Sequence, residues 1–145
     1  MIYFDTSALV KRYIDEPGSS YVNHLVSEAD YVAVSVLAYP ELMSALARKQ
    51  KARELSDADA SKAQNRFEAD WRSFLVADFQ AELLPLIKET VNRHQLRGAD
   101  SVHLATALWL KRQTGTDLSF ATADIALLQA ANHESLPTIN PLNAA

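Results

Sequence analysis

The chain has 145 residues, a formal net charge of −4, 48% hydrophobic residues and 22% charged residues. This length predicts a single domain, residues 1–145, that can bury a proper core. The absence of cysteine excludes disulfides, zinc–thiolate sites and thiol nucleophiles. No apolar segment is long enough to span a bilayer and no signal peptide is evident, so we expect a cytoplasmic protein without a membrane partner. The negative charge argues against a generally basic nucleic-acid-binding surface, but it leaves room for a local one.

The first strand is expected at Ile2–Phe4, a short apolar run that ends at Asp5. Such runs are typical of strands that are buried on both faces of a parallel sheet. Thr6 and Ser7 follow directly, and they can cap a helix that continues through residues 8–13. Asp5 is therefore predicted at the carboxyl end of a central strand, which is where open α/β sheets bind ligands.

The next elements alternate in type. A short helix is expected from Ser19 or Ser20, and a β-branched, uncharged run predicts a second buried strand at 31–36. The helix that follows contains Pro40 near its start, so its first turn should be irregular. Ser56–Asp59 resembles a capping box and opens another long helix.

The second half of the chain continues this alternation. The expected elements are a short strand at 74–79, a helix at 81–95 ended by Gly98, an apolar helix at 100–110, a buried strand at 118–122, a small helix after Asp124 and an edge strand at 135–140. Strands that alternate with helices over this length predict a three-layer α/β/α sandwich with a central parallel sheet.

Four acidic residues occupy equivalent places in this arrangement. Asp5 and Asp124 follow strand ends, while Glu41 and Asp100 lie near the starts of helices. Right-handed crossovers bring strand ends and the following helix starts to one edge of the sheet. Carboxylates that converge there repel one another unless they are protonated or bridged by a cation. Oxygen ligands without cysteine suit Mg²⁺ or Mn²⁺, which can activate a water molecule and neutralise charge on a phosphodiester.

Each acid also has a structural interpretation. Asp5 and Asp100 could be helix caps, Glu41 a solvated surface residue and Asp124 a turn residue. Taken singly, only Asp5 favours a functional role, but their coincidence at one edge favours a shared site. Asp117 precedes a strand and should lie at the opposite end of the sheet, so we exclude it from the site.

Four segments in order resemble the PIN-domain family, and within it the VapC-type toxins of type II toxin–antitoxin pairs. They are Asp5–Lys11, Pro40–Leu42, Arg97–Ala105 and Phe120–Asp124. The resemblance runs from Ile2 to about residue 141, which is nearly the whole chain. It implies a PIN-like fold and a metal-dependent endoribonuclease that cleaves RNA by metal-activated water. It also implies a cognate antitoxin as inhibitor and a homodimer.

The same resemblance implies roles for individual residues. It assigns an acidic metal site to four residues, Asp5, Glu41, Asp100 and Asp124. Ser7 or Thr6 is the implied polar helper near the metal. The expected cofactor is Mg²⁺, with Mn²⁺ as a substitute. The identity of the RNA does not follow from the sequence, since recognition of unpaired RNA depends on surface shape.

Several other residues invite a role in binding RNA. His103 lies one helical turn after the acid at position 100, so it could touch a phosphate, although a packed or surface histidine is the more common case. Arg97, Lys11 and Arg12 could meet phosphates, and the last two could equally be simple surface charges.

Aromatic and apolar helix faces have two interpretations. Tyr39 and Trp109 could stack on bases, but core packing is the safer assignment. The apolar faces over 39–46 and 67–75 are expected to form a groove for an antitoxin's amphipathic tail or for a second protomer.

Two alternative functions remain open on the residues alone. In an aspartyl-nucleophile phosphatase, Asp5 would attack a phosphate directly. Haloacid-dehalogenase-like phosphatases of that kind carry a second acid two residues later, where this chain has Ser7. In a non-catalytic α/β interaction module, Asp5 and its neighbours would serve structure only.

Overall fold

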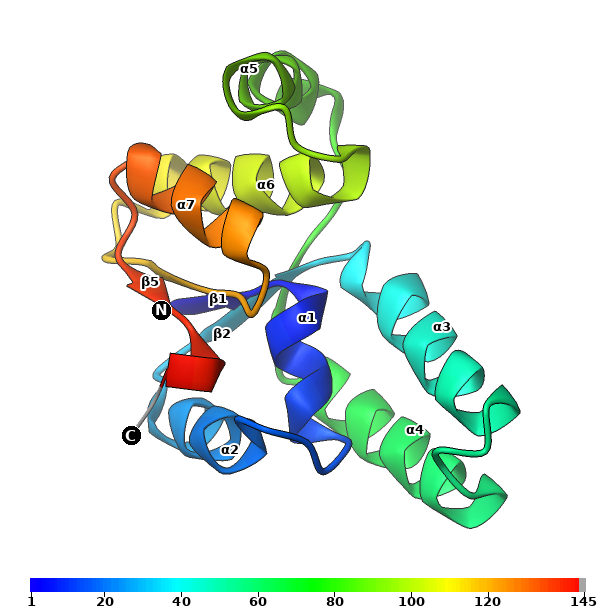
Figure 1. Cartoon of the computed structure of the whole chain (residues 1–145). Helices are drawn as coiled ribbons and strands as arrows, with labels where there is room; N and C mark the ends of the chain where they lie inside the picture. The colour runs from blue at the N-terminus through cyan, green and yellow to red at the C-terminus, as the bar shows by residue number, and fades with distance from the viewer. Residues whose placement is uncertain (144–145) are drawn as a thin grey trace.

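A five-stranded, all-parallel sheet forms the centre of the protein in a computed structural model that describes residues 1–143 (Figure 1). The strands, in the sheet order β3–β2–β1–β4–β5, are Leu75–Ala77, Val32–Ser35, Ile2–Phe4, Ser119–Ala121 and Thr138–Ile139. β1 is the central strand and β5 is an edge strand, as the sequence predicts. The strand order reverses between β1 and β4, and such a switch point is where a parallel sheet opens a crevice for a ligand.

Helices cover both faces of this sheet. They are α1 (Thr6–Leu9), α2 (Ser19–Glu28), α3 (Ala38–Lys51), α4 (Asp57–Trp71), α5 (Leu84–His94), α6 (Gly98–Thr114) and α7 (Ile125–His133), with 3₁₀ helices η1 (Val10–Arg12), η2 (Ala81–Leu83) and η3 (Pro141–Asn143). α5, α6 and α7 lie on one face and α1 to α4 on the other (Figure 1). The three-layer sandwich is therefore confirmed. Within residues 1–143, no helix has the length and apolar character to cross a membrane.

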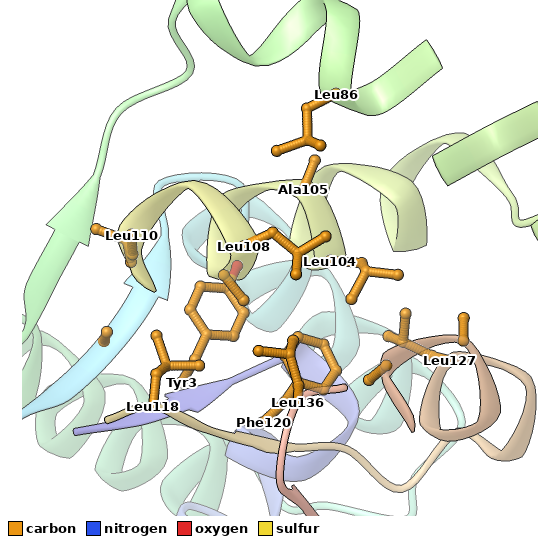
Figure 2. Packing of buried hydrophobic residues seen from close by; sticks show 14 of the residues in the cluster. Tyr3, Leu86, Leu104, Ala105, Leu108, Leu110, Leu118, Phe120, Leu127 and Leu136 are labelled. Atoms are coloured by element: carbon orange, nitrogen blue, oxygen red, sulfur yellow. The ribbon is translucent and has the colours of Figure 1, made fainter. Parts of the chain in front are cut away.

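The alternation of side chains along the strands divides the core into two clusters. Tyr3 and Phe120 belong to the cluster under α6 and α7, and their rings stack with centroids 5.4 Å apart (Figure 2). Phe4, Val34 and Ala121 point the other way, into the cluster that includes α1, α3 and α4. Successive residues of a strand face opposite sides of a sheet, so each short strand contributes to both clusters. This burial on both faces explains why the strands contain so few polar residues.

The start of the first helix differs from the prediction. Asp5, rather than Thr6 or Ser7, is the N-cap of α1, and its carboxylate accepts a hydrogen bond from the Ala8 backbone N–H. The helix makes a single turn before it tightens into η1. Because Asp5 is the cap, the two hydroxyl residues are free to make other contacts from the first turn.

The boundary between α5 and α6 also differs. Gly98 begins α6 instead of ending α5. α5 ends at Gln95, which adopts the left-handed conformation with φ 50° and donates its backbone N–H to Val91. Helices commonly end on a left-handed residue, which is usually glycine. The prediction therefore placed the end of the helix at Gly98, whereas Gln95 takes that conformation.

The helices α3 and α4 pack against each other through part of their apolar faces. Leu42, Leu46 and Phe67 are fully buried, and the rings of Tyr39 and Trp71 meet edge to face at 5.2 Å. The buried side chains have the core role expected of apolar residues at helical spacing. Because Tyr39 and Trp71 are only half-buried, the apolar groove over these two helices stays a prediction.

Candidate active site

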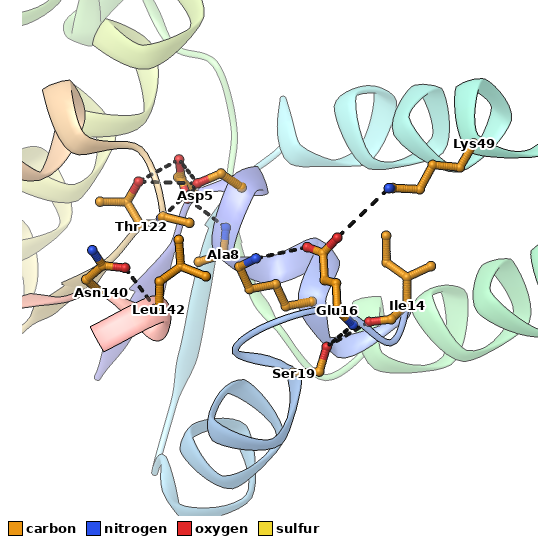
Figure 3. A network of polar contacts seen from close by, with 12 residues as sticks. Asp5, Ala8, Ile14, Glu16, Ser19, Lys49, Thr122, Asn140 and Leu142 are labelled. Atoms are coloured by element: carbon orange, nitrogen blue, oxygen red, sulfur yellow. Dashed lines mark hydrogen bonds and ion pairs between the residues drawn. The ribbon is translucent and has the colours of Figure 1, made fainter. Parts of the chain in front are cut away.

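A buried carboxylate lies at the switch point of the sheet. Asp5 directly follows β1, donates its backbone N–H to Ala121 of β4 at 3.1 Å, and is only 3% exposed. Its carboxylate accepts hydrogen bonds from Ser7 Oγ at 2.8 Å, from Thr122 Oγ1 at 3.0 Å and from the Ala8 backbone N–H at 3.1 Å (Figure 3). Burial raises the pKa of Asp5 to about 6, although these hydrogen bonds work in the opposite direction.

The second acid reaches the site from α3. Glu41 lies in the first turn of that helix, and its side chain is 31% exposed. Its Oε1 accepts hydrogen bonds from Thr6 Oγ1 at 2.8 Å and from His103 Nε2 at 2.6 Å. Burial opposes the charged form, but the hydrogen bonds from His103 and Thr6 outweigh it and lower the pKa of Glu41. Thr6 therefore joins α1 to α3 through this carboxylate.

The remaining two acids lie at helix starts on the other side of Asp5. Asp100 is in the first turn of α6, where burial raises its pKa and the nearby carboxylates of Asp124 and Glu41 raise it further. Asp124 is the N-cap of α7, and its Oδ1 accepts a hydrogen bond from the Leu127 backbone N–H at 2.9 Å. Because the carboxylates of Asp124 and Glu41 raise the pKa of Asp100, these three acids share one negatively charged region.

Two hydroxyl groups connect Asp5 to the loop that carries Asp124. Ser7 Oγ accepts a hydrogen bond from the Ala123 backbone N–H at 3.0 Å, and Thr122 Oγ1 accepts one from the Asp124 backbone N–H at 3.1 Å. The sequence analysis did not predict a role for Thr122, although a hydroxyl residue directly after a buried strand could have indicated one. Both hydroxyls also donate to Asp5, so they fix the orientation of its carboxylate.

His103 is a packed histidine rather than a substrate contact. It is 2% exposed, and its Nδ1 lies 2.9 Å from the hydroxyl of Tyr3. A histidine with so little exposure cannot reach an RNA phosphate outside the core. Tyr3 was another residue that sequence reasoning missed, since an aromatic residue inside a buried strand has no separate signal.

Lys11 and Arg12, which were candidates for contacts with RNA phosphates, form ion pairs within the protein instead. Lys11 is 7% exposed and its Nζ lies 3.0 Å from Glu16 Oε1 (Figure 3). The Nε of Arg12 lies 2.6 Å from Asp70 of α4. Of the three basic residues that could bind RNA, Arg97 alone is exposed, at the N-cap of α6 and close enough to Asp100 to lower its pKa.

Asp117 lies at the opposite end of the sheet. Its backbone carbonyl accepts a hydrogen bond from the amino group of Met1 at 3.3 Å. Met1 precedes β1 and Asp117 precedes β4, so both mark the amino ends of parallel strands. Asp117 is therefore separated from Asp5 by the full length of β1, as the sequence predicts.

The donor chemistry of the acidic region fits a hard divalent cation. The carboxylates supply oxygen ligands, burial raises the pKa of Asp5, and burial together with the carboxylates of Asp124 and Glu41 raises the pKa of Asp100. Across the described residues, no group of three or more His, Asp or Glu side chains converges closely enough to enclose a metal ion. This geometry still suits Mg²⁺, which is usually bound through one or two carboxylates and keeps several of its waters.

The sequence and the fold both resemble those of known proteins. The family model of the PIN domain matches residues 2–132. Ribonuclease VapC49 of Mycobacterium tuberculosis (strain ATCC 25618 / H37Rv) is 38% identical over 112 residues, which cover 74% of this chain and 75% of that protein. Ribonuclease VapC46 of the same strain is 31% identical over 147 residues, or 97% of each chain. In a toxin–antitoxin complex from Klebsiella pneumoniae, one chain superposes with a TM-score of 0.65 at 15% identity, over 97% of this chain and 98% of that one. The chain therefore belongs to the PIN-domain family.

Proposed function

We propose that this protein is a metal-dependent endoribonuclease and the toxin of a toxin–antitoxin pair. The observation that carries the proposal is the buried carboxylate of Asp5 at the switch point of the sheet. Glu41, Asp100 and Asp124 lie at the starts of three different helices, and the pKa of Asp100 shows that these three acids influence one another. A relative of similar length and 31% identity is named a ribonuclease, which supports RNA as the substrate. The phosphatase alternative requires an acid at position 7, where Ser7 is bonded to Asp5 instead.

The proposed metal is Mg²⁺, with Mn²⁺ as a substitute. Asp5 and Asp100 are the residues that we assign to holding it, and Glu41 and Asp124 contribute negative charge at the rim. A divalent ion bound at such a site supplies a nucleophilic water at neutral pH and neutralises charge that develops on the phosphate. The raised pKa values support this assignment, because a cation stabilises the charged form both of a buried carboxylate such as Asp5 and of one beside other carboxylates such as Asp100.

The residues around the acids hold them in place. Ser7 donates to both oxygens of Asp5, at 2.8 and 3.0 Å, so the carboxylate has little freedom to rotate. Thr6, at the neighbouring position on α1, donates to one oxygen of Glu41, Oε1, at 2.8 Å. Two adjacent hydroxyl residues therefore orient two acids on different elements. Arg97, exposed beside Asp100, adds positive charge at the mouth of the site, where it can attract a phosphate.

Hydrolysis by water needs neither a protein nucleophile nor the 2′-hydroxyl of the RNA. A 2′-hydroxyl mechanism requires an acid–base pair, and the nearest histidine, His103, is buried with both ring nitrogens engaged. The products that we expect carry a 5′-phosphate and a 3′-hydroxyl. A 2′,3′-cyclic phosphate would be the product of the other mechanism.

The test is to map the ends of cleaved RNA in Mg²⁺, in Mn²⁺ and in EDTA. We expect metal-dependent cleavage that leaves 5′-phosphate ends, and at least about a hundredfold loss of kcat in Asp5→Asn, since a group that acts only in the transition state is removed. Asp117→Asn is the matched control, because it makes the same substitution at the other end of the sheet and should keep wild-type activity. Cyclic-phosphate ends, or cleavage that persists in EDTA, would overturn the proposal.

The proposed partner is a cognate antitoxin protein that inhibits cleavage. The similarity of fold to a chain of the toxin–antitoxin complex from Klebsiella pneumoniae supports this proposal. Purified antitoxin should reduce RNA cleavage in a one-to-one ratio with the toxin. An antitoxin that leaves cleavage unchanged at saturation would exclude it as the inhibitor.

A further inference from the structure

A chain of hydrogen bonds runs from the core to the rim of the acidic site. It begins at the hydroxyl of Tyr3 on β1, passes through both ring nitrogens of His103 on α6, and ends at Glu41 on α3. The two links measure 2.9 and 2.6 Å. Tyr3 is fully buried and stacks on Phe120, so the inner end of the chain is fixed by the packing shown in Figure 2.

The partners determine the direction of these hydrogen bonds. An ionised carboxylate can only accept, so His103 Nε2 carries a proton and donates it to Glu41. In the neutral imidazole, Nδ1 is then the acceptor, and the hydroxyl of Tyr3 donates to it. Burial raises the pKa of Tyr3 well above its ordinary value, so the phenol keeps the proton that it donates. Every group in the chain is therefore satisfied in one arrangement.

Glu41 needs such an anchor because its own helix does not supply one. α3 starts without a side-chain cap, and Pro40, the residue before Glu41, has no backbone N–H to contribute. A glutamate side chain has three rotatable bonds and loses considerable entropy when it is held in one orientation. Thr6 and His103 both bond to Oε1. Among residues 1–143, no hydrogen bond reaches Oε2, so this oxygen is not engaged by another side chain.

We propose that His103, held in place by Tyr3, is a positioning residue that orients the carboxylate of Glu41 toward the acidic site. The role of Glu41 in that site rests on the proposed function. His103 acts through Glu41 and does not touch the RNA. A histidine that only fills the core would need neither a protonated Nε2 nor a partner on α3.

Three variants separate positioning from packing. His103→Leu fills the same part of the core with an apolar side chain and removes both hydrogen bonds of the histidine ring. His103→Gln keeps an amide N–H that can donate to Glu41, and Tyr3→Phe keeps the ring that stacks on Phe120 while it removes the hydroxyl. The control is Leu118→Ala, which opens a cavity beside the amino end of β4 and destabilises the fold away from this chain.

The measurements are kcat and KM for RNA in Mg²⁺, Mn²⁺ affinity by calorimetry, and the free energy of unfolding. We expect His103→Leu to lower kcat about tenfold or more and to weaken Mn²⁺ binding, while KM for RNA changes less than about twofold, as for residues that orient the groups around a metal site. Tyr3→Phe should show a smaller loss of the same kind, and His103→Gln should recover much of kcat. Leu118→Ala should lose stability and keep wild-type kcat and Mn²⁺ affinity.

A double variant tests whether His103 works through Glu41. If it does, Glu41→Gln combined with His103→Leu should lower kcat no further than Glu41→Gln alone, because the two changes remove one shared function. Additive losses would overturn the proposal, as would wild-type kcat and Mn²⁺ affinity in both His103→Leu and Tyr3→Phe.

A spectroscopic measurement keeps this inference distinct from the proposed function. The ¹⁵N shifts of His103 in the wild-type protein should report a protonated Nε2 and an unprotonated Nδ1, and Glu41→Gln should change them. The opposite tautomer would overturn the inference even if the protein cleaves RNA. A protein with the expected tautomer that cleaves no RNA would overturn the proposed function and leave the orientation of Glu41 by His103 standing.

Discussion

At the scale of single residues, Asp5 has two roles that conflict when no metal is bound. It caps α1 through the Ala8 backbone N–H, which stabilises the fold, yet its burial disfavours the charge that its proposed role as a metal ligand requires. The three donors around it lower the cost of that charge without removing it. A pKa of about 6 is the result of this balance.

The first residue-scale prediction concerns the stability of the metal-free protein. The pKa of Asp5 is raised from 3.8 to about 6 in the folded state, so the folded protein binds this proton more tightly than the unfolded chain does. The stability that results is fully present below the pKa of Asp5 in the unfolded chain, and it is lost as pH rises through the pKa in the folded protein. In EDTA, from about pH 4 to about pH 7.5, the unfolding free energy of the wild type should therefore fall by about 2 kcal/mol relative to Asp5→Asn. Urea titrations of the two proteins measure this difference, and parallel pH profiles would contradict it.

The second residue-scale prediction separates the two roles of Asp124. Asparagine is as good an N-cap as aspartate, so Asp124→Asn should keep stability within about 0.5 kcal/mol while it weakens Mn²⁺ binding. Asp124→Ala also removes the acceptor for the Leu127 backbone N–H, and it should cost about 1 kcal/mol more. Urea unfolding and calorimetry on the two variants give both quantities. Wild-type Mn²⁺ affinity in the asparagine variant would reduce Asp124 to a helix cap.

At the scale of elements, the site depends on where four helices begin. α1 and α7 start at strand ends with an aspartate as N-cap, and α3 and α6 carry their acids in the first turn. Acids at helix N-termini are favoured by the helix dipole, so the same positions that stabilise the helices also collect negative charge at one edge of the sheet. The carboxyl ends of these helices, in contrast, carry none of the four acids.

The element-scale prediction concerns such an end. Gln95 closes α5 in the left-handed conformation with φ 50°, which is unfavourable for a residue with a Cβ atom. Gln95→Gly should be about 1 kcal/mol more stable than Gln95→Ala, because only glycine adopts this conformation without steric cost. Thermal and urea unfolding compare the two variants. RNA cleavage should be unchanged in both, and an alanine variant as stable as the glycine variant would contradict the argument.

At the scale of the whole molecule, the α3–α4 pair bears on how partners can bind. Leu42, Leu46 and Phe67 are buried by the fold, whereas Tyr39 and Trp71 are only half-buried. A partner that binds in the predicted groove would contact these half-buried side chains rather than the buried ones. The homodimer remains a proposal drawn from the family.

The whole-molecule prediction is the mass of the protein in solution. Light scattering at micromolar concentration should give twice the mass of one chain, and addition of the cognate antitoxin should raise it further. Removal of the antitoxin's C-terminal tail should abolish binding to this protein. A purely monomeric mass would contradict the dimer, and binding that survives loss of the tail would contradict the tail's role.

Much of the fold followed from the sequence alone. The apolar run at Ile2–Phe4 and the alternation of strands with helices predicted the parallel sheet and the central place of β1. The order of the elements also predicted that Asp5 and Asp124 follow strand ends and that Asp117 lies at the opposite end of the sheet. These features are local, because short apolar runs, caps and crossover handedness are encoded within a few neighbouring residues.

The tertiary structure alone decided which side chains meet. Thr122 bonds to Asp5 across 117 residues, and His103 bonds to Glu41 across 62. The depth of His103 in the core follows from how α6 is rotated against the sheet, and no periodicity in the sequence specifies the partner that its ring nitrogens find. Contacts between distant segments depend on helix rotation and side-chain rotamers together, so they become visible only when the elements are packed.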